Sequence, residues 1–117
     1  MNYLYVNVIR INDNERDRTF QKVIEQKDIE LAVCRHGEEM QDFRSFTKEV
    51  EVKGFKVINN RNKETKLTNT DISFRGDTLT IQAHNFHNCI IRVYFTITNK
   101  LNREKKLYID IETNFTY

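Results

Sequence analysis

The sequence predicts an all-β protein: an antiparallel two-sheet β-sandwich of about seven or eight strands, in a single domain over residues 1–117. Three observations support this prediction. Apolar residues recur at every second position through most of the C-terminal half, which is the period of strands with one buried face. Turn-forming residues separate these runs at the short spacing typical of sandwiches. The chain lacks the regular alternation of strand and helix patterns that would indicate an α/β fold.

The first predicted element is a strand over residues 3–11. Leu4, Val6 and Val8 fall on one face of this strand. The other face carries Tyr3, Tyr5, Ile9 and Ile11. Because both faces are apolar, we expect this strand either to be central in a sheet or to be sandwiched between layers.

Residues 15–45 form the ambiguous part of the chain, and we expect at most one short helix there. Residues 19–25 fit either a helix or a strand. Residues 28–34 carry an apolar side chain at every second position, which favours a strand. Residues 38–43 can form one helical turn.

Further strands are predicted in the middle of the chain. The alternation over residues 46–58 is interrupted at Gly54, and an isolated glycine in a strand pattern indicates a bulge or bend. Residues 71–74 and 78–84 form a hairpin around Gly76, because glycine supplies the positive φ that a tight turn needs.

The last two strands, residues 90–99 and 107–115, are joined by the charged loop 100–106. Their buried faces are aliphatic, and their outer faces combine tyrosine with polar residues, a composition typical of binding surfaces. The same residues would also stabilise a solvent-exposed sheet through cross-strand pairs. The candidate partner-binding residues are Tyr94, Thr96, Tyr108, Asp110 and Glu112.

Composition excludes several classes of function. The net charge of +2 gives no general affinity for polyanions. No nucleophile elbow, phosphate-binding glycine loop or paired carboxylate is recognisable, so we expect no enzymatic activity and no cofactor. The first residues enter a strand pattern without a signal-peptide pattern, so we expect a cytoplasmic protein. The first hypothesis is a non-catalytic protein–protein interaction module that binds a protein partner or its own copy. Proline and tryptophan are absent while asparagine, isoleucine and lysine are abundant, a usage typical of AT-rich genomes such as those of low-GC bacteria and their phages. This composition fits a bacterial or phage accessory protein, such as an inhibitor of a host protein or a small virion component.

A nucleic-acid-binding β-module is the first alternative. Two basic segments, residues 59–66 and 100–106, would contact phosphates if they lay at the same end of the sandwich. Charged loops also serve solubility, which is the simpler explanation. The candidate residues are Arg61, Lys63, Lys66, Arg103, Lys105 and Lys106.

A small zinc protein is the second alternative. Cysteine and histidine occur in two short clusters, and two ligand-bearing segments can build a tetrahedral site. The spacing matches no standard zinc finger, and isolated cysteines are more often buried in a core. The candidate ligands are Cys34, His36, His84, His87 and Cys89.

Overall fold

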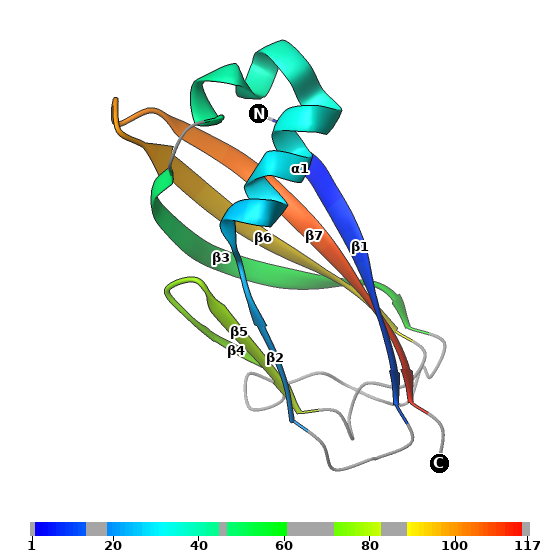
Figure 1. Cartoon of the computed structure of the whole chain (residues 1–117). Coiled ribbons are helices and arrows are strands. Elements are labelled where there is room, and N and C mark those ends of the chain that lie inside the picture. Colours follow the sequence, from blue (N-terminus) through cyan, green and yellow to red (C-terminus); the bar gives the residue numbers. More distant parts are fainter. Residues whose placement is uncertain (1, 14–18, 45–46, 61–71, 83–88, 116–117) are drawn as a thin grey trace.

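The computed structural model describes residues 2–13, 19–44, 47–60, 72–82 and 89–115. They form seven strands in two sheets and one helical segment, which confirms the all-β, two-sheet prediction and the helix within residues 15–45 (Figure 1). The elements are β1 (Leu4–Asp13), β2 (Thr19–Val23), α1 (Gln26–His36), the 3-10 helix η1 (Gly37–Phe43), β3 (Thr47–Asn60), β4 (Ile72–Arg75), β5 (Thr78–Gln82), β6 (Cys89–Asn99) and β7 (Glu104–Phe115). Positions 46, 71, 83 and 84 of the predicted strands lie outside the described residues.

The larger sheet has four strands in the order β1–β7–β6–β3. β6 is antiparallel to both of its neighbours, as expected for a sandwich, but β1 runs parallel to β7. Because β1 is the first strand in this order, it lies at an edge of the sheet. The prediction of a central first strand was wrong.

A bulge in β1 explains the misleading pattern of this strand. The pairing of β1 with β7 shifts between Tyr5 and Val8, so the alternation of faces changes phase there. Before the bulge Val6 is buried, and after it Ile11 is buried. Because the buried positions shift by one residue at the bulge, the apolar residues of the single buried face fall on both faces of an ideal alternation. In the sequence, this strand therefore looks like one with two apolar faces.

The smaller sheet has three antiparallel strands in the order β2–β5–β4. The predicted hairpin between β4 and β5 is confirmed, with Gly76 at a φ of 61° in its turn. The backbone carbonyls of this turn also accept hydrogen bonds from β3 and from the residue that follows β2. Val52 of β3 donates a hydrogen bond to the Gly76 carbonyl at 2.8 Å, and Ile24 donates to the Asp77 carbonyl at 2.9 Å. The turn therefore covers part of the open edge of β3.

Residues 28–34 lie within α1, so the prediction of a strand there was wrong. The apolar residues that α1 buries are Ile29, Ala32 and Val33, which have helical rather than strand spacing. Asp28 accepts a hydrogen bond from the backbone N–H of Glu25 at 2.8 Å, which caps the first turn. Gly37, at a φ of 57°, ends the helix.

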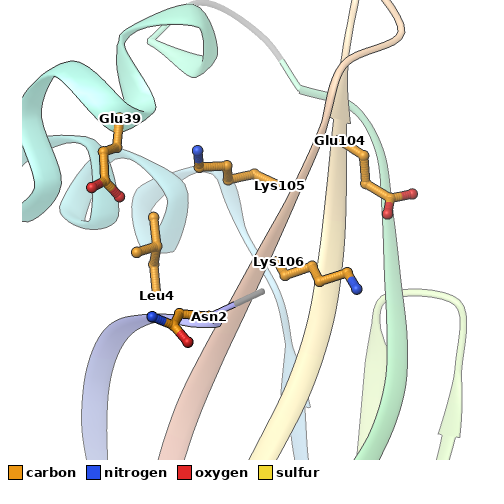
Figure 2. Close-up of a pocket in the computed structure, with 6 residues that line it drawn as sticks. All are labelled: Asn2, Leu4, Glu39, Glu104, Lys105 and Lys106. Atoms are coloured by element: carbon orange, nitrogen blue, oxygen red, sulfur yellow. The ribbon is translucent and has the colours of Figure 1, made fainter.

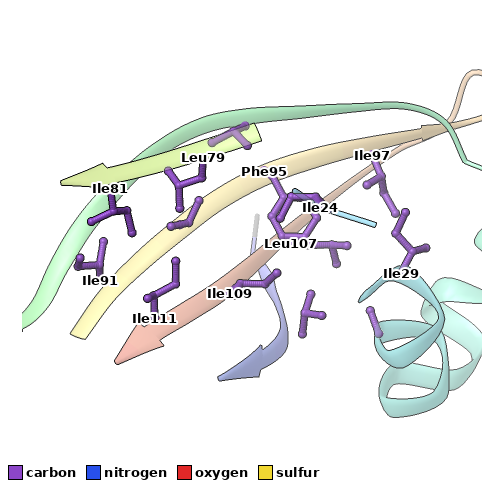
Figure 3. Packing of buried hydrophobic residues seen from close by; sticks show 14 of the residues in the cluster. Ile24, Ile29, Leu79, Ile81, Ile91, Phe95, Ile97, Leu107, Ile109 and Ile111 are labelled. Carbon is purple, nitrogen blue, oxygen red and sulfur yellow. The ribbon is translucent and has the colours of Figure 1, made fainter. Parts of the chain in front are cut away.

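α1 and the three-stranded sheet cover the same face of the four-stranded sheet, as Figure 1 shows. The side chains between these layers form one hydrophobic core. In Figure 3, Ile29 of α1 lies beside Ile97 at one end of the core, and Ile81 lies beside Ile91 at the other. Phe95, which is fully buried, occupies the middle of β6 between these ends.

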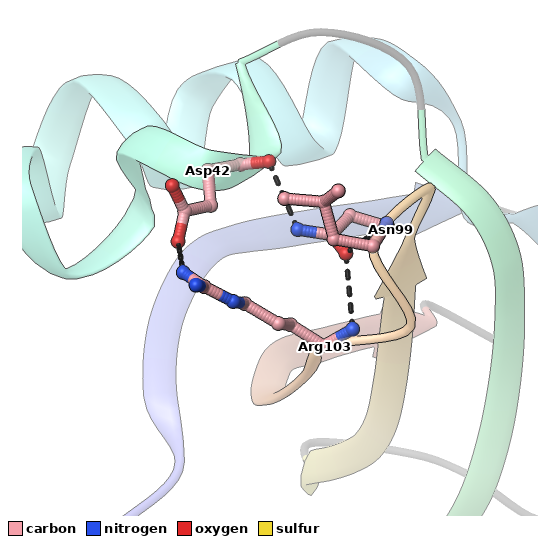
Figure 4. Close-up of polar contacts among 4 residues, drawn as sticks. Asp42, Asn99 and Arg103 are labelled. Carbon is pink, nitrogen blue, oxygen red and sulfur yellow. Dashed lines mark hydrogen bonds and ion pairs between the residues drawn. The ribbon is translucent and has the colours of Figure 1, made fainter.

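The β6–β7 turn is joined to η1 through the buried side chain of Asn99 (Figure 4). Its amide nitrogen donates to the Asp42 carbonyl at 3.1 Å. Its amide oxygen accepts hydrogen bonds from the backbone N–H groups of Leu101 and Arg103, both at 3.0 Å. Arg103 also forms an ion pair with the Asp42 carboxylate. Asn99 thus holds the turn and the helical segment together.

We expect Asn99→Ala to lower the free energy of unfolding by about 2–3 kcal/mol, because it leaves two N–H groups and one carbonyl without their partner. Urea unfolding followed by circular dichroism measures this loss. Leu101→Ala in the same turn is the control, since Leu101 is 69% exposed and should change stability little. Equal midpoints for the two variants would contradict the role given to Asn99.

Candidate functional site

The outer face of the four-stranded sheet is the candidate functional site. No helix or strand among the described residues packs on it, because α1 and the smaller sheet lie on the opposite face (Figure 1). Residues Leu107, Ile109 and Ile111 of β7 point into the core, so Tyr108 and Asp110 between them point outward. The same alternation places Arg92, Tyr94 and Thr96 of β6 on this face.

Four tyrosines meet at the centre of this surface, which we call the tyrosine face. The rings of Tyr94 and Tyr108, on adjacent strands, have centroids 6.4 Å apart. Tyr3 contacts Tyr94 at 4.7 Å edge-to-face, and Tyr5 contacts Tyr108 at 5.4 Å. All four side chains are half-buried, so each ring packs against a neighbour and still exposes part of its surface.

Three cations lie over these rings. The guanidinium of Arg92 is 4.2 Å from the centroid of Tyr108, and that of Arg35 is 5.0 Å from the centroid of Tyr5. The ammonium of Lys106 is 5.6 Å from the centroid of Tyr3. These are cation–π distances. Arg35 comes from the last turn of α1, so the helix adds a charge to the edge of a face that it does not cover.

Arg92 and Asp110 form a salt bridge on the tyrosine face. Arg92 donates from Nε at 2.9 Å and from a terminal nitrogen at 3.2 Å, so the pair is bidentate. The hydrogen bond to Asp110 raises the pKa of Arg92 above its ordinary value. The two residues lie directly opposite each other in the β6–β7 register. This pair fixes the guanidinium over Tyr108.

The five candidate partner-binding residues all lie on β6 or β7, but they do not contribute equally to the surface. Thr96 is only 5% exposed, so it offers little surface to a partner. Glu112 lies beyond the tyrosines and pairs with Arg10 at 3.4 Å. Tyr94, Tyr108 and Asp110 are at the centre.

Gly54 leaves one side of Tyr94 open. It lies opposite Tyr94 in the β3–β6 register, directly after a shift in the pairing, so the bulge predicted from the sequence is confirmed. A Cβ atom placed on Gly54 would have no other heavy atom within 4 Å. The β3 side of the Tyr94 ring therefore has space for an additional group.

The basic segments do not form one cluster among the described residues. Arg61, Lys63 and Lys66 lie outside the described part of the chain, as does most of the segment 59–66. The prediction of a loop over 100–106 was wrong at its end, because Glu104 to Lys106 belong to β7. Arg103 pairs with Asp42, and Lys106 lies over Tyr3. Lys105 points to the other side of the sheet, opposite Ile97.

The three proposed zinc ligands that the structure describes, Cys34, His36 and Cys89, do not form one cluster. Cys34 is exposed on α1, where side chains two residues apart diverge by about 200°, so it does not share a face with His36. His36 instead donates from Nε2 to the Tyr5 carbonyl at 2.6 Å. Cys89 is buried at the start of β6. His84 and His87 lie outside the described residues, and the described ones contain no group of three potential ligands.

A depression of about 460 Å³ lies beside the start of β7 (Figure 2). Its lining residues are Asn2, Leu4, Glu39, Glu104, Lys105 and Lys106. Figure 2 shows Lys105 pointing towards the side of η1, whereas Glu104 and Lys106 point the opposite way. The charged groups that line the depression therefore do not converge on one point.

Comparison with protein-family models, characterised proteins and solved structures finds no match to this chain. Within the described part of the chain, no helix combines the length and apolar character needed to cross a bilayer.

Sequence reasoning missed four residues of the tyrosine face. Tyr3 and Tyr5 were assigned to the same face as Ile9 because the bulge in β1 has no sequence signal of its own. Arg35 was missed because residues 28–34, directly before it, were interpreted as a strand, so the helix that carries Arg35 was not predicted. Arg92 could have been found, since it alternates with Tyr94 on the polar face of a well-patterned strand.

Proposed function

We propose that this chain is a non-catalytic protein-binding module whose binding surface is the tyrosine face. The observation that carries this proposal is the cluster of four half-buried tyrosines with Arg35, Arg92 and Lys106 over their rings. Tyrosine and arginine dominate the energetic centres of protein interfaces, because they offer large rigid contact areas together with hydrogen-bond donors.

The geometry of the rings favours a protein partner over nucleic acid. Bases stack on aromatic faces that lie open. Here the rings are inclined to one another by 49–61°, and three of them have a cation over one face. A protein partner can instead fill the irregular surface between the rings, including the open side of Tyr94 beside Gly54.

Affinity capture from a cell lysate tests this proposal with three baits: the native protein, Gly54→Glu and Gly54→Ala. Gly54→Glu places a charged side chain beside Tyr94, so we expect it to reduce capture of specific partners at least about tenfold. Gly54→Ala is the matched control, because its small side chain meets no neighbouring atom and should retain them. Alanine at Tyr94 is less suitable, since it would also remove the contacts with Tyr3 and Tyr108.

Equal recovery of every captured protein by all three baits would contradict the proposal, provided that circular dichroism shows the same fold. If nuclease treatment removes the captured material, the nucleic-acid alternative is correct instead. The measurement is quantitative mass spectrometry of the eluates, with and without nuclease.

A further inference from the structure

Charges on the tyrosine face are arranged in rows across the sheet. The central row contains Gly54, Tyr94, Tyr108 and Tyr5, which are uncharged and paired side by side across the four strands. The nearest row of outward-facing residues on the side of the β6–β7 turn contains Glu51 of β3 and Lys106 of β7. On the far side, the corresponding row contains Lys56 of β3, Arg92 of β6 and Asp110 of β7, and Arg92 pairs with Asp110 at 2.9 Å.

On β3 and β7, the two rows carry charges of opposite sign. β3 has Glu51, which pairs with Lys53 at 3.1 Å, on the turn side and Lys56 on the far side, whereas β7 has its cation on the turn side and its anion on the far side. Along these two strands the pattern is complementary to itself. A second copy can be placed face to face with the first by a two-fold axis that lies in the plane of the interface. If this axis is perpendicular to the strands and passes above the central row, each strand lies over the same strand of the second copy. The two charged rows then change places, so each row faces the other.

This operation creates two kinds of ion pair, each occurring twice. Glu51 comes to face Lys56 of the second copy, and Lys106 comes to face Asp110 of the second copy. The outermost rows bring Glu104 opposite Glu112, but Glu112 already has Arg10 at 3.4 Å to offset its charge. The symmetric arrangement therefore matches charge in the rows nearest the centre, where complementarity matters most for specificity.

The centre of the face suits such a pairing. The tyrosines of two copies meet around the axis, and the two Gly54 positions face each other without side chains. Four strands about 4.8 Å apart and about ten residues long present roughly 600 Å² per copy. The total of about 1,200 Å² lies at the lower end of specific interfaces, which indicates a reversible dimer.

We propose that the tyrosine face binds a second copy of this chain, face to face, in this two-fold antiparallel arrangement. The inference rests on the proposed function, because it names the occupant of the same surface. Sheets that pack face to face stay about 10 Å apart, a distance that long side chains such as Glu51 and Lys56 can bridge from both sides.

A charge exchange on β3 tests the proposal, with association measured by sedimentation equilibrium over a concentration series up to about 0.3 mM. Glu51→Lys leaves cations at both β3 positions, and Lys56→Glu leaves anions at both. Each variant alone should dimerise at least about tenfold more weakly than the native protein. An equimolar mixture of the two should recover the native affinity, because every β3 contact is then between opposite charges.

Two further variants serve as controls. The double variant Glu51→Lys with Lys56→Glu should dimerise like the native chain, which shows that neither change damages the fold. Glu30→Lys alters the net charge by the same amount as Glu51→Lys but lies exposed on α1, so it should leave dimerisation unchanged.

A native protein that stays monomeric throughout the series overturns the dimer, as does a mixture that fails to recover association. The capture experiment separates this failure from that of the proposed function. If the native protein is monomeric and Gly54→Glu still loses specific partners, the face binds a different protein. If neither association nor capture depends on the face, both proposals fail.

Discussion

Phe95→Ala is expected to lower the free energy of unfolding by about 3–5 kcal/mol, because it opens a large cavity at the centre of the core. Phe95 is fully buried and lies between Val52 and Leu107 on the neighbouring strands. α1 and the smaller sheet pack against opposite ends of this core, so neither can move to fill the cavity without losing its own contacts (Figure 3). Equilibrium unfolding in urea measures the loss.

Phe74→Ala is the matched control for this variant. It removes the same atoms from β4, where the side chain is 39% exposed, and we expect a much smaller loss. A urea midpoint for Phe95→Ala close to that of the native protein would mean that the two layers do not share the core described here.

Asp28→Ala is expected to lower the free energy of unfolding by about 3–5 kcal/mol, because it breaks a buried ion pair. The Asp28 carboxylate accepts hydrogen bonds from the Lys22 ammonium at 3.0 Å and the Glu25 backbone N–H at 2.8 Å. The Lys22 side chain is only 13% exposed. Without Asp28 this ammonium has no carboxylate partner among the described residues, and α1 loses the cap of its first turn.

Asp28→Asn separates these two contributions. The amide oxygen can still accept the hydrogen bond from Glu25, but the negative charge beside Lys22 is lost, so we expect an intermediate stability. Glu30→Ala, on the exposed side of the same helix, should change stability little. A loss below about 1 kcal/mol for Asp28→Ala would contradict the buried pair.

The strands of the C-terminal half were predictable because their alternation extends over many residues. β6 and β7 bury an aliphatic side chain at every second position through most of their lengths, and no helical pattern fits such long runs. The hairpin at Gly76 was predictable for a different reason, since its turn residue is locally required.

The helix was mistaken for a strand because its apolar run is short. Ile29, Leu31 and Val33 fit a period of two, while Ile29, Ala32 and Val33 fit a helical face equally well. Signals at the ends of the segment favour the helix: Asp28 caps the first turn and Gly37 follows the last one. Over seven residues, these end signals were more informative than the periodicity.

The tyrosine face was only partly predictable. Tyr94 and Tyr108 follow from the alternation of β6 and β7, which also places them on the same side of the sheet. Tyr3 and Tyr5 join them through the parallel pairing of β1 with β7 and the phase change at the β1 bulge. Both features involve partners that are about a hundred residues apart, so no local pattern records them.

The amino-acid sequence by itself determined which segments of the C-terminal half are strands and which side of each is buried, because side-chain alternation is a local property of the backbone. Tertiary structure alone decided the order of the strands, the edge position of β1 and the meeting of four tyrosines with their cations. These features depend on which hydrogen-bonding edges meet, and that choice is made by the packing of the whole core rather than by any single segment.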